Sequence, residues 1–125
     1  SALRRSKHDR KIKIYQETVL PMRNSLIEGI SRIDNGEFAI DVIKDLFQNQ
    51  KKSILAFRGT LSKNDLYPFL QIWQQYENYY NDVCTRSDAE IIYPSEGNEE
   101  LKIKQQKDIK QEFFLKLLDT LSLKY

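Results

Sequence analysis

Apolar side chains recur at three- and four-residue steps in four stretches of the chain, which predicts four amphipathic helices. The third stretch has the clearest pattern, because Phe69, Trp73, Tyr76 and Tyr80 place four large rings on one face of a helix. A stripe of this kind packs against other helices far more often than it binds a ligand, since each ring buries a large area. It therefore indicates architecture rather than activity.

The first helix is predicted over residues 6–33, with a proline inside its apolar pattern. Its apolar face consists of Ile12, Tyr15, Val19, Met22, Leu26, Ile30 and Ile33. A proline such as Pro21 removes one backbone donor and clashes with the preceding turn. We expect a kink near residues 18–20, or two helices in series. Asp34-Asn35-Gly36 is a strong stop signal for this helix.

The other three helices are predicted over residues 38–57, 62–85 and 98–125. Ser62 is a good N-cap, and Asp65 three residues later can reach back to it. In the second helix residues 48–52 form a polar, exposed middle. The fourth helix has one apolar row, formed by Ile109, Phe113, Leu117 and Leu121, with Phe114 and Leu118 beside it.

Short connections between the first three helices favour antiparallel neighbours, so we predict an all-α, up-down four-helix bundle with the first helix kinked at Pro21. Residues 86–98 are the least regular segment. They contain Ile91-Ile92-Tyr93, which we expect to plug an open end of the core. Asn98 is the expected N-cap of the fourth helix.

Charge divides the chain into two regions. Residues 1–13 carry six basic side chains against Asp9 alone, a net charge of +5; the whole chain has +2, so the remainder carries −3. The basic residues are Arg4, Arg5, Lys7, Arg10, Lys11 and Lys13. We call residues 1–13 the basic head and residues 14–125 the helical bundle domain. A whole-chain net charge conceals this asymmetry.

The beginning of the sequence has two explanations: an initiator methionine was removed before the small Ser1, or the chain is a segment of a longer protein, which we favour. The chain starts with Ser1 and no secretory signal follows, because no apolar stretch succeeds the basic residues. A basic run at the very start is what a chain cut just after a transmembrane helix would have. The single cysteine, Cys84, suits a reducing compartment and is expected to be a small buried hydrophobe.

Catalytic and metal-binding patterns are weak. His8 is the one histidine and lies among basic residues, where a solvent-facing role is favoured over a general base. Glu-x-x-His motifs, phosphate-binding glycine loops and nucleophile elbows do not occur. Asp41 with Asp45, and Asp108 with Glu112, have the spacing of solvated helix pairs. We therefore expect a non-enzymatic protein without a cofactor, a metal ion or catalytic residues.

Two tyrosines, Tyr67 and Tyr79, lie off the main aromatic stripe. We predict that they are candidates for contact with a protein partner. The basic head has three possible roles: a solvated terminus, contact with anionic lipid headgroups, or contact with nucleic-acid phosphates. The net acidity of the remainder argues against nucleic acid, because such proteins generally spread positive charge over a folded face.

The sequence resembles a group of small bacterial membrane-anchored proteins in several short motifs. These are Phe57-Arg58, Leu61, Trp73-x-x-Tyr76 and the Leu20-Pro21 step, and the resemblance spans about residues 5–80. Proteins of this group have a transmembrane segment near the N-terminus, a basic stretch and a helical cytoplasmic domain. The resemblance implies a location at the cytoplasmic face of a bacterial inner membrane and no established activity.

Three hypotheses follow. The first is a non-enzymatic helical domain of a membrane-anchored protein, whose basic head contacts lipid and whose bundle contacts another protein or its own copy. The second is a soluble regulatory module that binds nucleic acid through the same head. The third is an enzyme whose site is assembled from ordinary carboxylates, which a convergent acidic cluster would indicate.

Overall fold

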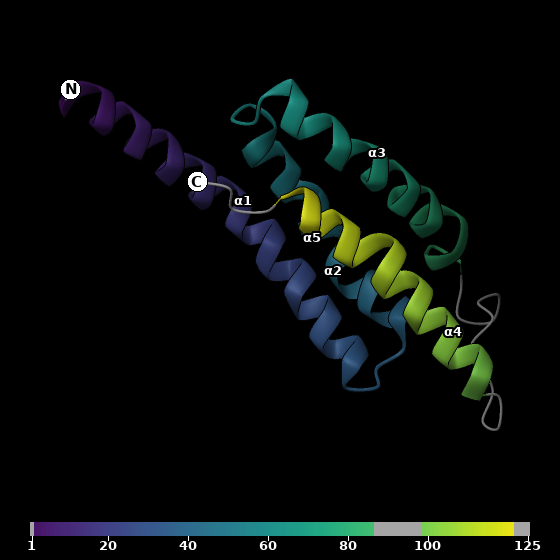
Figure 1. Cartoon of the computed structure of the whole chain (residues 1–125). Coiled ribbons are helices and arrows are strands. Elements are labelled where there is room, and N and C mark those ends of the chain that lie inside the picture. The colour runs from purple at the N-terminus through teal and green to yellow at the C-terminus, as the bar shows by residue number, and fades with distance from the viewer. Residues whose placement is uncertain (1, 87–98, 122–125) are drawn as a thin grey trace.

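The computed structural model describes residues 2–86 and 99–121, which form an all-α bundle (Figure 1). The bundle consists of four helical stretches within these ranges. The first two are α1 (Ala2–Asp34) and α2 (Ala39–Arg58). The third is α3 (Lys63–Tyr79) with a π-helical continuation, η1 (Tyr80–Cys84); the fourth runs through α4 (Glu99–Ile109), π-helical η2 (Lys110–Leu115) and α5 (Lys116–Thr120). The predicted fold class is thus confirmed, whereas the up-down order stays a prediction.

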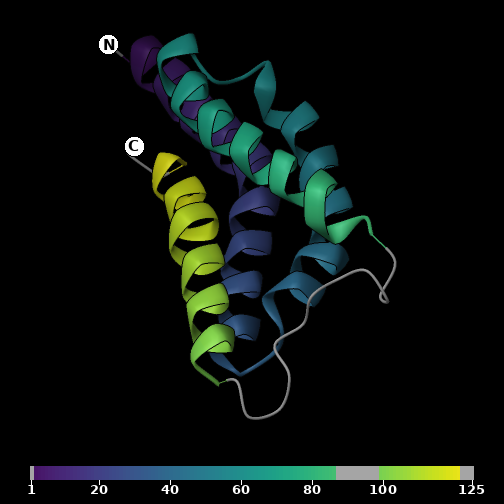
Figure 2. The same cartoon turned by 90° about the vertical axis from the view of Figure 1, so that its right-hand side faces the viewer.

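The four stretches pack around one core. α1 lies along α2, α2 packs against η1, and the η2–α5 stretch lies against both α1 and α3 (Figure 2). Every stretch contributes fully buried side chains, among them Met22, Phe47, Phe69, Tyr76 and Phe114. The predicted aromatic stripe of α3 is buried as expected, except that Tyr80 is only half-buried.

Aromatic rings fill the space between α2 and α3. The ring of Phe47 stacks on Trp73 with centroids 5.3 Å apart and on Tyr80 at 3.7 Å. Tyr76 meets Phe114 edge to face at 5.6 Å. Offset-stacked and edge-to-face pairs stabilise a core beyond the area they bury, by about 0.5–1.5 kcal/mol each. The stripe therefore acts as a packing surface.

A single helix, α1, runs through Pro21. The expectation of two helices in series is therefore wrong, and the kink stays a prediction. Pro21 is exposed, so its ring lies on the solvent side of the helix. Val19 and Met22 on the opposite side are fully buried and hold both flanking turns to the core. Thr18 Oγ1 also donates to Ile14 O at 2.9 Å, within the turn before the proline.

The π-helical segment η2 changes which residue of the last stretch enters the core. The predicted apolar row contained Phe113, but Phe114 is the fully buried ring and Phe113 is half-buried. A π turn bonds residues five apart instead of four, so it shifts the positions that follow it. As a result Ile109, Phe114, Leu117 and Leu121 form the buried row.

Gly29 in the middle of α1 makes room for Phe114. A Cβ atom built on Gly29 would lie 2.7 Å from Cε2 of Phe114 and 3.3 Å from Cδ1 of Leu46. Any other residue at this position would push the ring away. Close approach of α1 and η2 therefore requires a glycine here.

The α3 N-terminus is as predicted, whereas one polar residue of α2 is not. Ser62 Oγ accepts a hydrogen bond from Asp65 N at 3.3 Å and donates to Asp65 Oδ2 at 3.0 Å. Residues 48–52 were expected to be exposed, but Gln50 is fully buried. It is buried because its Oε1 accepts a 2.6 Å hydrogen bond from the Tyr76 hydroxyl. The predicted plug formed by Ile91-Ile92-Tyr93, and the Asn98 cap, lie outside the described residues.

Candidate functional site

The basic head is the part of α1 that projects beyond the other helices (Figure 1). Its six basic side chains are all exposed: Arg4, Arg5, Lys7, Arg10, Lys11 and Lys13. The buried face of α1 starts at Tyr15, which is 8% exposed. α1 is continuous across residues 13 and 14, so the head and the bundle share one helix.

The base of the head is tied to the connection between α2 and α3. Thr18 Oγ1 lies 3.1 Å from Thr60 Oγ1, and the Thr60 hydroxyl donates to Phe57 O at 2.9 Å. Lys13, the last residue of the head, pairs with Glu17 one turn later across an exposed 3.9 Å contact. An exposed pair of this kind contributes little to stability. Lys13 is therefore held only weakly by Glu17.

A cavity of about 510 Å³ lies between the head and the α2–α3 connection. His8 and Lys11 form one wall, while Ser62 and Asp65 form the other. The Ser62 hydroxyl and the Asp65 carboxylate already bond to each other in the helix cap. The wall formed by Ser62 and Asp65 therefore offers few unused polar groups. His8, the only histidine in the sequence, is exposed in the other wall, and the structure describes no hydrogen bond between it and a carboxylate.

A second cavity, about 560 Å³ in volume, lies between the end of α3 and the α4–η2 stretch, and we call it the α4 groove. It is lined by Tyr79, Leu101, Lys104, Gln105, Asp108, Ile109, Glu112 and Phe113. Tyr79 and Phe113 place their rings 5.4 Å apart in its wall. Figure 1 shows α4 at the end of the bundle away from the N-terminus, so the groove and the head are well separated.

The two tyrosines predicted to contact a partner differ in exposure. Tyr67 is 56% exposed on the first turns of α3. Tyr79 is half-buried and packs on Phe113 in the wall of the α4 groove. Burial, followed by the neighbouring Cys84 and Asp108, raises the pKa of Tyr79 to about 12, so its hydroxyl stays neutral at pH 7. A neutral phenol both donates and accepts hydrogen bonds.

Cys84 is buried at the end of η1, as predicted. Burial is the main reason why the pKa of its thiol rises to about 12. The thiolate is the reactive form of cysteine, so this environment suppresses nucleophilic chemistry at neutral pH. His8 lies exposed in the head on α1, and no contact between the two side chains is described.

The acidic pairs noted in the sequence do not converge. Asp45 Oδ2 accepts from Arg32 at 2.6 Å, and Glu112 Oε2 accepts from Lys116 at 2.8 Å. Within residues 2–86 and 99–121, no group of three or more histidine, cysteine or acidic side chains is placed to hold a metal ion. The same part of the chain contains no helix long and apolar enough to cross a bilayer.

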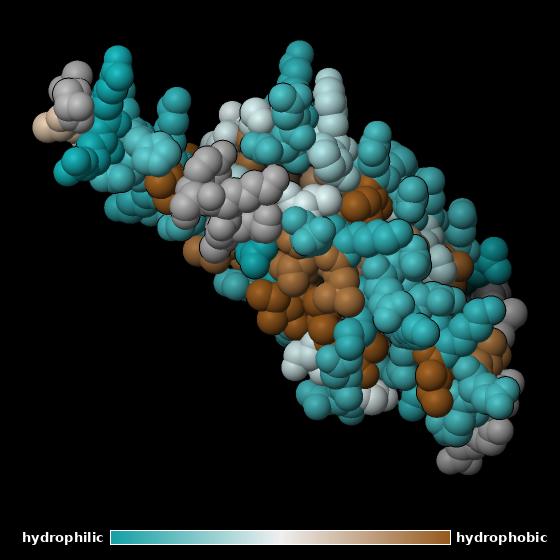
Figure 3. Space-filling model, viewed as in Figure 1, coloured by the Kyte–Doolittle hydropathy of each residue, from teal (hydrophilic) through white to brown (hydrophobic). Residues whose placement is uncertain are grey.

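Hydrophobic side chains also gather on the surface between α1 and α5 (Figure 3). Leu20, Ile27 and Leu115 are each more than a third exposed. Arg23, on the same stretch of α1, donates from Nη1 to Leu121 O at 2.7 Å, which holds the C-terminal end of the last stretch against α1. We call this surface the α1–α5 seam.

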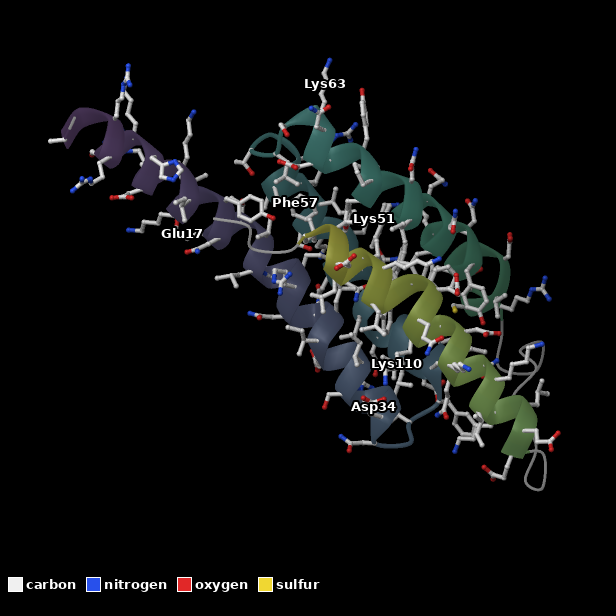
Figure 4. All side chains as sticks on the ribbon, in the orientation of Figure 1. Glu17, Asp34, Lys51, Phe57, Lys63 and Lys110 are labelled. Carbon is white, nitrogen blue, oxygen red and sulfur yellow. The ribbon has the colours of Figure 1, made fainter. Side chains whose placement is uncertain are left out.

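Ion pairs also join the helices around the C-terminal end of α1. Figure 4 shows Lys110 and Asp34 pointing toward each other, with Nζ and Oδ1 2.6 Å apart. Arg32 bonds both Glu37 and Asp45, and its contacts with Glu37 lower the pKa of that carboxyl. These pairs join α1, α2 and η2 where the chain turns. Their role is structural.

No protein-family model matches the chain, and no curated protein or solved structure is detectably similar to it. Functional conclusions therefore rest on the residues themselves. Reading the sequence placed Tyr79 among the candidate residues but missed the α4 groove around it. The groove leaves only a weak pattern in the sequence, because its lining combines residues of α3 with residues more than 20 positions later in the chain.

Proposed function

We propose that this chain is a non-enzymatic helical domain that works at the cytoplasmic face of a bacterial inner membrane. In this proposal the basic head contacts anionic lipid headgroups and the bundle contacts a protein. The observation that carries the proposal is the placement of six exposed basic side chains on helical turns that project beyond the core. The resemblance to membrane-anchored proteins supports the same location.

The composition of the head favours an electrostatic contact. Residues 4–11 of α1 are all exposed, and none of them is apolar. A helix that is polar all round cannot insert an apolar face into a membrane or a groove. Each lysine or arginine close to an anionic leaflet contributes about 1 kcal/mol of attraction. Six such residues are enough for a salt-sensitive association.

The α1–α5 seam supports the second half of the proposal. Exposed apolar side chains that gather in one place mark contact surfaces more often than scattered ones do. Leu20 and Ile27 are exposed on α1, Leu115 is exposed on η2, which packs against α1, and Tyr67 is exposed on α3. We propose the seam as the face that another protein, or a second copy of this chain, covers. Sedimentation velocity over a range of concentrations separates these two partners.

Flotation with lipid vesicles tests the role of the head. Three proteins are compared: the intact chain, a head variant with all six basic residues changed to glutamine, and a matched control. The control changes six exposed basic residues outside the head to glutamine: Lys52, Arg58, Lys63, Arg86, Lys104 and Lys107. Both variants lose the same charge, so net charge alone cannot explain a difference between them.

We expect the intact chain and the control to float with vesicles that contain anionic lipid, and the head variant to remain in the soluble fraction. Vesicles of purely zwitterionic lipid should bind none of the three. Equal flotation of the intact chain and the head variant would reject the lipid role. An oligonucleotide arm covers the alternative function: tighter, salt-dependent binding to duplex or single-stranded oligonucleotides than to vesicles would favour a nucleic-acid-binding module.

A further inference from the structure

The α4 groove presents mostly hydrogen-bond acceptors on an apolar floor. Ile109 is 2% exposed and forms the floor together with Phe113, while Leu101 forms an edge that is 44% exposed. The polar rim holds the carboxylates of Asp108 and Glu112. Lys104 is the one cationic side chain in the lining. The rim is therefore suited to a ligand that donates hydrogen bonds and carries positive charge.

One acceptor in the lining is left without a partner. Gln105 Oε1 is buried and forms no hydrogen bond with any residue that the structure describes. A buried amide oxygen is normally satisfied, and those that are not require an explanation. Because Gln105 Oε1 is fully covered, a donor group in the groove would bond to it only after the amide turns toward the cavity. This orphaned atom is an observation independent of the charges on the rim.

The two carboxylates of the rim are not equivalent. Glu112 is already neutralised by Lys116, with Nζ and Oε2 2.8 Å apart. Asp108 forms no ion pair within residues 2–86 and 99–121, and it lies close enough to Tyr79 to influence that hydroxyl electrostatically. Asp108 therefore provides a carboxylate without an ion-pair partner in the described part of the chain, beside the neutral hydroxyl of Tyr79.

The aromatic wall adds a second reason for a cation. The rings of Tyr79 and Phe113 are tilted by 46° with centroids 5.4 Å apart. Ring faces attract organic cations, and an apolar body would pack on the same rings and on Leu101. The volume of about 560 Å³ falls within the range of small-molecule sites.

We propose that the α4 groove binds a small organic ammonium ion with an aromatic or branched apolar body. Its ammonium group is bound by the Asp108 carboxylate, Gln105 Oε1 and the Tyr79 hydroxyl. Its apolar body lies on Phe113, Ile109 and Leu101. This site is distinct from the basic head, so its presence or absence does not depend on lipid binding.

The experiment uses 2-phenylethylammonium as the probe, with 2-phenylethanol and phenylacetate as matched neutral and anionic compounds. Amide chemical shifts of the ¹⁵N-labelled chain are followed during titration at pH 7. We expect saturable shifts at Tyr79, Gln105 and Asp108 with the ammonium compound alone. Equal responses to the ammonium compound and the alcohol, or no saturable response to any of the three, would overturn the proposal.

Two substitutions test the assigned contacts. Asp108→Asn removes the charge and should weaken binding of 2-phenylethylammonium about tenfold, which corresponds to one charge-assisted hydrogen bond. Asp119→Asn is the matched control, because Asp119 is exposed on α5 outside the lining and should leave binding unchanged. Tyr79→Phe keeps the ring, and we expect it to weaken binding less than Asp108→Asn does. Unchanged affinity in Asp108→Asn, with a native circular dichroism spectrum, would contradict the assignment.

Discussion

The two ends of α1 lie in different environments although they belong to one continuous helix. From Tyr15 to Ile33 the helix buries an apolar face that includes Val19, Met22 and Leu26, all fully inaccessible to solvent. From Arg4 to Lys11 every side chain is exposed. A helix in water is stabilised mainly by packing of its apolar face, so the head gains helical structure only by propagation from the bundle.

This difference separates stability from interaction. The buried half of α1 carries the free energy of folding, because the hydrophobic effect scales with the apolar area removed from water. The basic head carries a net charge of +5, whereas the rest of the chain carries −3, and the head contributes little to the packing of the core. Substitutions in the buried half of α1 should therefore affect stability, and substitutions in the exposed head should affect binding.

The largest effect is expected at the ring that fills the space beside α1. Phe114→Ala removes a fully buried ring that meets Tyr76 and Gly29. We expect the free energy of unfolding to fall by about 3–5 kcal/mol, because the lost contacts leave a cavity that the helices fill only in part. Urea denaturation followed by circular dichroism measures it. A loss below about 1 kcal/mol would show that this end of the core is loosely packed.

A smaller loss of stability is expected for Gly29→Ala, although replacing glycine by alanine inside a helix normally stabilises it. Gly29→Ala should destabilise the chain by about 1–3 kcal/mol, since the new methyl group overlaps the ring of Phe114. Gly59→Ala is the control, because a Cβ atom there meets nothing within 4 Å. Thermal melts of both variants would separate the two effects. Equal midpoints would mean that α1 and η2 can move apart without cost.

The buried polar pair should come next. Tyr76→Phe removes the only hydrogen bond described for the fully buried Gln50 side chain, whose Nε2 already has no partner in the described part of the chain. We expect a loss of about 1–3 kcal/mol, since an unsatisfied buried amide keeps its full desolvation penalty. The double variant Gln50→Leu with Tyr76→Phe should recover most of the loss. No recovery would indicate that packing of the amide matters more than the hydrogen bond.

The smallest effect on stability is expected in the head. Changing all six basic residues to glutamine should alter the free energy of unfolding by less than about 0.5 kcal/mol in total, because the side chains are exposed and removal of their mutual repulsion offsets small losses. Urea denaturation of the intact and substituted chains provides the measurement. A decrease comparable to that of Phe114→Ala would show that the head packs on the bundle.

Most of the fold follows from the sequence, because periodicity records which residues face the core. The α3 stripe, the Ser62 cap and the buried Cys84 are all readable in this way. The change of register at η2 is not, since a π turn leaves adjacent Phe113 and Phe114 equally plausible as the core ring. The buried position of Gln50 is hidden for another reason: its partner Tyr76 lies on a different helix.

The two candidate sites also differ in how far the sequence alone predicts them. The basic head is a local run of charges and can be read directly from the sequence. The α4 groove joins Tyr79 to residues 101–113, and only the folded arrangement places these side chains together. Sites assembled from distant residues leave no spacing pattern in the chain, so sequence reasoning identified Tyr79 but not its surroundings.

The most direct test measures amide hydrogen exchange along α1 with and without anionic vesicles. It tests the claim that the buried half of this helix provides stability and the exposed head provides binding. We expect strong protection for residues 15–33 in both samples, and weak protection for residues 4–11 that rises only when anionic lipid is present. Purely zwitterionic vesicles should leave the head unprotected. Strong protection of residues 4–11 in the free chain, or no change on addition of anionic vesicles, would contradict it.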